Sequence, residues 1–125
     1  MSIMNFYVYG SLTNGEIHFN KFFKCSNATR PGAIRGSAYR LEVGYPVVLK
    51  EGDQEIPGEI VTCAVSDMAL NLMDEFHGFS RVTPEKSLYI REEIDVRTED
   101  GAYIKANGYF FNALKLPKSA KLIPH

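Results

Sequence analysis

Two short segments contain residues whose types and spacing could do chemistry. In the first, the apolar run 3–9 ends at Tyr9, and the chain turns through Gly10, Ser11 and Leu12. A sharp turn after a strand can direct several backbone N–H groups into one concavity, which suits a carboxylate or a developing oxyanion. A glycine after a strand is also common where chains simply turn, so an ordinary turn is the alternative.

The second segment is 73–78, Met-Asp-Glu-Phe-His-Gly, at the end of a predicted helix. His77 could move protons near neutral pH, because the unperturbed pKa of a histidine is about 6.5. Its alternative role is structural, since a cation at the end of a helix is favoured by the helix dipole. Glu75 stands roughly 200° around the helix from His77 and is expected to point elsewhere. Asp74 is expected to be solvent-exposed or a structural cap.

Strands and one helix must position these residues. Apolar, β-branched and aromatic runs predict strands at 3–9, 33–43, 47–49, 56–65, 88–96 and 103–111. Ser66 is the expected N-cap of the helix, and Gly78 its stop. Asp100-Gly101 predicts a hairpin between the last two strands. Five or six strands, mostly in hairpins, with one clear helix indicate an α+β fold with a small, mostly antiparallel β-barrel.

Composition limits the class of protein. A chain of 125 residues fits one domain, which we predict at 1–113 with a C-terminal tail at 114–125. The net charge is -1, and the 14 basic residues are spread out, so nothing predicts a nucleic-acid surface. No apolar run reaches the roughly 18–20 residues that span a bilayer. The N-terminus lacks the pattern of a signal peptide, which predicts a cytoplasmic protein. His18, His77 and His125 share no metal-ligand spacing.

Further motifs follow the first turn in a fixed order. They are Gly36 with Tyr39 and Leu41, Gly44-Tyr45-Pro46, Gly58-Glu59, the helix end 72–78, Tyr89 with Arg91, and Tyr109. Together with Tyr9-Gly10-Ser11-Leu12, this ordered set resembles the γ-glutamylcyclotransferase-like family, which includes AIG2-like and γ-glutamylamine cyclotransferase-like proteins. The resemblance spans residues 3 to about 112.

That resemblance implies a compact, barrel-like α+β fold with a pocket where the motifs meet. It implies that a γ-glutamyl amine or peptide is cyclised to 5-oxoproline with release of an amine, without metal or cofactor. The partner would be a small γ-glutamyl or related carboxylate ligand; the oligomeric state stays open. The substrate-binding candidates are Tyr9, Gly10, Ser11, Leu12, Tyr45, Tyr89 and Tyr109.

One position departs from the family pattern. The family's helix end usually has the sequence Leu-Asp-x-x-Glu-Gly, and His77 stands where the catalytic glutamate is expected. A carboxylate attracts a substrate ammonium, whereas an imidazolium repels it. Glu59 is a weaker alternative base, provided that its side chain faces the pocket. Three functions are therefore open: an enzyme using His77 or Glu59, a catalytically impaired binding module, or a scaffold with a vestigial pocket.

Overall fold

The computed structural model describes residues 2–9, 28–42, 44 and 46–123. The predictions for Gly10, Ser11, Leu12 and Tyr45 therefore lie outside the described residues. Within them, the strands are β1 Ser2–Val8, β2 Ala28–Arg40, β3 Pro46–Val65, β4 Tyr89–Thr98, β5 Tyr103–Phe111 and β6 Lys121–Leu122. The helices are α2 Asp67–Phe76 and two short 3-10 turns, η2 Pro84–Lys86 and η3 Ala113–Lys115.

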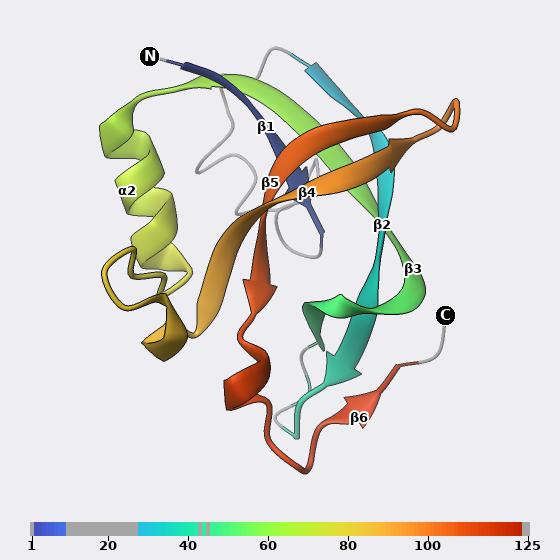
Figure 1. The fold of residues 1–125 in the computed structure, drawn as a ribbon, viewed down its shortest axis with the longest axis vertical. Coiled ribbons are helices and arrows are strands. Elements are labelled where there is room, and N and C mark those ends of the chain that lie inside the picture. Colours follow the sequence, from blue (N-terminus) through green and yellow to red (C-terminus); the bar gives the residue numbers. More distant parts are fainter. Residues whose placement is uncertain (1, 10–27, 43, 45, 124–125) are drawn as a thin grey trace.

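The sheet closes on itself as a ring (Figure 1). Its strand order is β3-β1-β5-β4-β2-β6, and β2 also pairs with β3, which joins the two sides of the ring. Every described pairing is antiparallel except the one between β1 and β5. This arrangement confirms the predicted α+β class, its mostly antiparallel sheet and its one clear α-helix within the described part of the chain.

The strands predicted at 47–49 and 56–65 form one long strand, so their separation was wrong. β3 continues through both, and its pairing with β2 shifts register between Gly36 and Ser37. Gly36 pairs with Gln54, whereas Ser37 pairs with Leu49, so residues 50–53 form an irregularity inside the strand. The backbones approach closely there, because a Cβ on Gly36 would lie 2.4 Å from the Leu49 carbonyl oxygen. Glycine allows this close approach of the two backbones because it has no side chain.

The two faces of β1 separate the core into two parts. Phe6 and Val8 pack on the outside of the ring beneath Met73 of α2, whereas Tyr7 points inward among apolar residues such as Ile56. This alternation follows from the two-residue period of a strand. Tyr109 of β5 belongs to the outer cluster and so lies beside α2. The strand pattern therefore brings β5 against the helix that carries His77.

Local signals fix both ends of α2. The Ser66 hydroxyl accepts a hydrogen bond from the Ala69 N–H at 3.1 Å, which confirms the predicted N-cap. At the other end His77 is the C-cap, and Gly78 has a φ of 65°, a left-handed conformation that glycine adopts readily. The helix therefore stops with His77 at its last turn.

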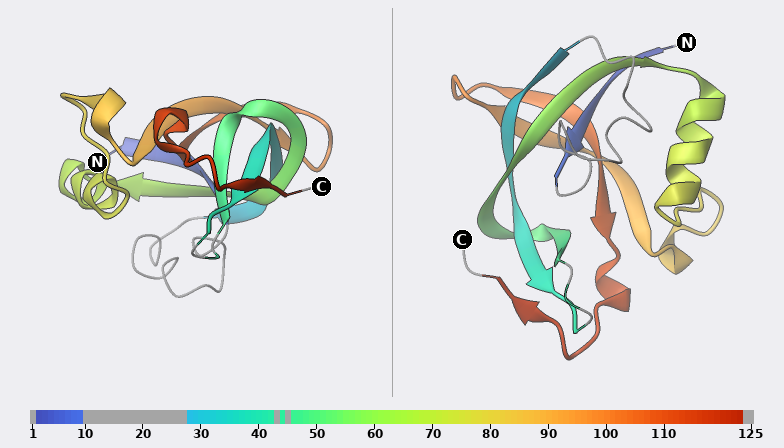
Figure 2. Two further views of the ribbon diagram at one scale, coloured as in Figure 1. Left: turned by 90° about the horizontal axis from the view of Figure 1, so that it is seen from below. Right: turned by 180° about the vertical axis from the view of Figure 1, so that it is seen from behind.

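The C-terminal segment folds back against the ring. β6 pairs with the end of β2, and the Ile123 N–H donates to the Ala38 carbonyl at 2.8 Å. The Gln54 side chain also donates to the Ile123 carbonyl at 2.5 Å. α2 and β6 lie on opposite sides of the ring (Figures 1 and 2). The proposed boundary at residue 113 stays a prediction.

Candidate active site

A cavity of about 820 Å³ opens at the end of α2 and extends along the inside of the ring. At the helix end its wall includes His77, Tyr89 and Tyr109. At the other end the wall is mostly apolar, with Ala38, Val48, Ile56 and Ile123, and the lining also includes Arg40. Tyr9 joins the two ends, because it packs on the inner core and donates its hydroxyl to the Tyr109 carbonyl at 2.5 Å. The cavity is large enough for a small-molecule ligand.

His77 is held in one tautomer by its own helix. Its Nδ1 lies 2.8 Å from the carbonyl oxygen of Met73, one turn earlier. A carbonyl oxygen only accepts hydrogen bonds, so Nδ1 must carry the proton in this contact. In the neutral ring Nε2 is then the basic atom. Phe76 and Tyr89 meet the imidazole edge-on, with centroids 5.0 and 5.9 Å away.

Tyr109 supports the flat face of the imidazole. The two rings are stacked with centroids 3.7 Å apart and planes 7° from parallel. The Tyr109 hydroxyl points past His77 and donates to Oδ1 of Asp74 at 2.6 Å. Burial, and then the hydrogen bond to Asp74, raise the pKa of Tyr109 well above its ordinary value. Tyr109 is therefore a neutral hydroxyl donor throughout the physiological pH range.

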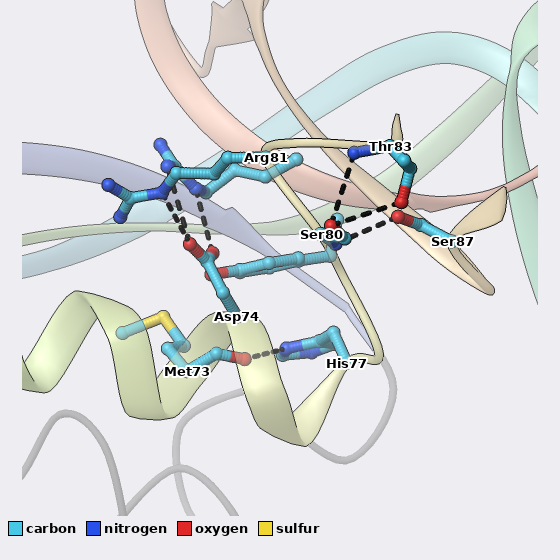
Figure 3. A network of polar contacts seen from close by, with 9 residues as sticks. Met73, Asp74, His77, Ser80, Arg81, Thr83 and Ser87 are labelled. Atoms are coloured by element: carbon cyan, nitrogen blue, oxygen red, sulfur yellow. Dashed lines mark hydrogen bonds and ion pairs between the residues drawn. The ribbon is translucent and has the colours of Figure 1, made fainter. Parts of the chain in front are cut away.

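Asp74 is the centre of a charged network (Figure 3). The residue is buried, and Arg91 from β4 donates through Nε to Oδ1 at 2.9 Å. Arg81, from the loop after α2, donates through Nε to Oδ2 at 3.1 Å. The expectation that Asp74 would be solvent-exposed is thus wrong. Two guanidinium groups and the Tyr109 hydroxyl occupy the carboxylate, so its burial is compensated by charge and by hydrogen bonds.

The loop that carries Arg81 is pinned at both ends. The Leu88 N–H donates to the Gly78 carbonyl at 3.2 Å, and the Ser80 N–H donates to the Ser87 hydroxyl at 2.8 Å (Figure 3). Asn112 adds hydrogen bonds from its side chain to the carbonyls of Glu85 and Ser87, at 3.0 and 2.9 Å. These bonds hold the loop beside the end of α2, so that Arg81 can reach Asp74.

The family model described as gamma-glutamyl cyclotransferase, AIG2-like, matches residues 6–125. The chain belongs to this family. The match covers nearly the whole chain and includes the C-terminal segment that pairs with β2. A comparison with curated proteins found no match.

Solved structures share the fold. A solution structure of a protein from Arabidopsis thaliana has a TM-score of 0.69 at 20% identity, covering 95% of this chain and 75% of that one. A crystal structure of an AIG2-like protein from Mus musculus has a TM-score of 0.67 at 20% identity, covering 95% and 83%. A structure described as gamma-glutamyl cyclotransferase has a TM-score of 0.60 at 17% identity, covering 98% and 73%. Identities this low show the fold alone.

The structure brings together four residues that the sequence singled out as candidates. Tyr9, His77, Tyr89 and Tyr109 all line the cavity. Their roles in binding or catalysis stay predictions. Glu59 pairs with Val8 across β1 and β3 and is not among the described lining residues, although Val8 is. Its role as an alternative base also stays a prediction.

Sequence reasoning missed other parts of the site. Glu75 lines the cavity, although its angle from His77 predicted that it would point elsewhere. Arg91 of β4 forms an ion pair with Asp74 of α2. The spacing of Asp74 and Tyr109 gave no signal of their contact, because 35 residues separate them.

Neither a metal-ligand cluster nor a membrane-spanning helix occurs among the described residues. No cluster of three or more histidine, cysteine, aspartate or glutamate side chains in this part of the chain could hold a metal ion. No described helix is long and apolar enough to cross a membrane.

Proposed function

We propose that this protein cyclises the γ-glutamyl group of a γ-glutamyl amine or peptide to 5-oxoproline and releases the amine. The observation that carries the proposal is the placement of His77. It stands at the position that the family resemblance assigns to the catalytic glutamate, and it lines the cavity with Nδ1 bound to Met73. Family membership supports the reaction class. A cytoplasmic location is part of the same proposal.

His77 would move one proton during the reaction. The α-ammonium of the substrate first loses one proton to water, and the resulting neutral α-amine attacks its own γ-carbonyl carbon, so that the new C–N bond closes a five-membered ring. The attacking nitrogen then carries a surplus proton, which Nε2 of His77 accepts. The imidazolium donates this proton to the leaving nitrogen as the old C–N bond breaks. One residue thus serves as base and then as acid, which is a common use of histidine.

Other groups would bind the substrate. The N–H groups of residues 10–12 are the sequence-predicted donors to the oxyanion, and Tyr89 offers a hydroxyl or an aromatic wall. A neutral imidazole attracts an ammonium less than a carboxylate does. Among the described residues that line the cavity, Glu75 is the one that carries a carboxylate. It could offset part of the charge that the change from glutamate to His77 removes.

A panel of γ-glutamyl amines and γ-glutamyl dipeptides tests the proposal. We expect wild-type protein to release 5-oxoproline from at least one member, as measured by chromatography. The alternative is a binding module, favoured by the histidine at the glutamate position. In that case a ligand raises the melting temperature without turnover, and His77→Glu gains the activity that wild type lacks. If neither wild type nor His77→Glu releases 5-oxoproline, and no ligand raises the melting temperature, the scaffold function is the one that remains.

A further inference from the structure

We propose that Tyr109 and Asp74 are positioning residues that fix the orientation of His77 in the cavity; this inference rests on the proposed function. Two contacts define the imidazole. The hydrogen bond from Nδ1 of His77 to the Met73 carbonyl oxygen, at 2.8 Å, fixes how the imidazole is rotated in its own plane. The Tyr109 ring sets the plane itself, because the two rings stack 3.7 Å apart and within 7° of parallel. Together the contacts fix the direction in which Nε2 points.

Tyr109 can serve as a platform only if its own ring is held. Its hydroxyl is anchored on Asp74 at 2.6 Å, and Asp74 is in turn held by Arg91 at 2.9 Å and Arg81 at 3.1 Å. The anchors therefore come from three separate elements: α2, β4 and the loop after α2. Each oxygen of the carboxylate accepts from a guanidinium, and Oδ1 also accepts from the phenol.

The network acts through Tyr109 and not by direct proton transfer. Asp74 is 4% exposed and is not among the described residues that line the cavity. Its oxygens are occupied by three donors, so it is poorly placed to act as a base. Tyr109 is kept neutral by burial and by its bond to Asp74. The role left to Tyr109 and Asp74 is to hold His77 in place. Small errors in the placement of a catalytic group are costly, since a displacement of about 1 Å can reduce a rate by 10²-fold.

Two variants of Tyr109 test the inference against a matched control. Tyr109→Phe keeps the stacked ring but removes the anchor to Asp74, whereas Tyr109→Leu removes the platform. We expect kcat to fall about tenfold in the first and about 100-fold in the second, with KM for the phenylalanine variant within about twofold of wild type. Tyr103→Phe is the control, because Tyr103 lies on the same strand but is exposed. It should retain wild-type kinetics.

A measurement without turnover separates this inference from the proposed function. In wild-type protein, the ring current of Tyr109 should shift the His77 ring protons upfield in an NMR spectrum. This shift should be lost in Tyr109→Leu and unchanged in the Tyr103 control, with thermal melts checking that each variant folds. Unchanged His77 resonances in Tyr109→Leu would overturn the inference, as would altered resonances with undiminished kcat. If wild type releases no 5-oxoproline, the proposed function fails, and the resonances alone decide the positioning claim.

Discussion

Asp74→Ala is expected to lower the free energy of unfolding by about 3 kcal/mol, at the lower end of the range for breaking a buried ion pair. The carboxylate is buried and accepts from Arg91, Arg81 and Tyr109. Its removal leaves the largely buried Arg91 guanidinium and the Tyr109 hydroxyl without this acceptor. The half-exposed Arg81 can turn to water, which limits the loss. Urea denaturation of both proteins measures the difference.

The control for this prediction is Asp95→Ala. Asp95 also forms an ion pair, with Lys105 at 2.7 Å, but both side chains are largely exposed on the hairpin of β4 and β5. Exposed pairs contribute little, so this variant should denature close to the wild-type midpoint. The free energy of unfolding of Asp74→Asn should lie between those of Asp74→Ala and Asp95→Ala, because the asparagine amide oxygen can still accept a hydrogen bond from Tyr109. An Asp74→Ala protein as stable as wild type would show that the network contributes nothing to folding.

His77→Ala is expected to reduce the turnover of γ-glutamyl substrates by roughly 10²- to 10⁴-fold, the usual contribution of a general acid–base. The variant removes the Nε2 atom to which both proton-transfer steps are assigned. His77→Gln provides a stricter test, because glutamine keeps polar atoms near the cavity but has no basic nitrogen. Both variants should be equally inactive. Initial rates of 5-oxoproline formation at saturating substrate measure the effect.

The same Asp95→Ala protein serves as the control for activity, because Asp95 lies on the hairpin and does not line the cavity. It should turn over substrate at the wild-type rate. His77→Ala with wild-type turnover would remove His77 from the reaction and direct attention to Glu59 or Glu75. Binding of a γ-glutamyl ligand, measured by calorimetry, would show whether the cavity of the inactive variant still accepts substrate.

Local sequence signals predicted most of the fold. The apolar and aromatic run in β1, the Ser66 cap, the Gly78 stop and the Asp100-Gly101 turn each act within a few residues, so the sequence reveals them directly. β3 was harder, because Gly52 and Asp53 have the composition of a loop. Its continuity depends on pairing with β2 across the register shift at Gly36, which is a contact distant in sequence.

The site was only partly predictable for the same reason. The ordered motifs led to Tyr9, His77, Tyr89 and Tyr109, which the fold places around one cavity. They gave no indication of what supports His77. The burial of Asp74 depends on Arg91, which arrives from another element 17 residues later in the chain. A carboxylate near a helix end looks exposed until its partners are placed around it.

The most direct test of the central claim is a product balance on wild-type protein. A γ-glutamyl amine is incubated with the protein, and 5-oxoproline, glutamate and the free amine are quantified together. Intramolecular attack by the α-amine predicts that 5-oxoproline and amine appear in equal amounts without glutamate. Glutamate in place of 5-oxoproline would mean that water is the nucleophile, and the absence of both products across the panel would mean that the site does not catalyse this reaction. Either result would contradict the proposed cyclotransferase reaction.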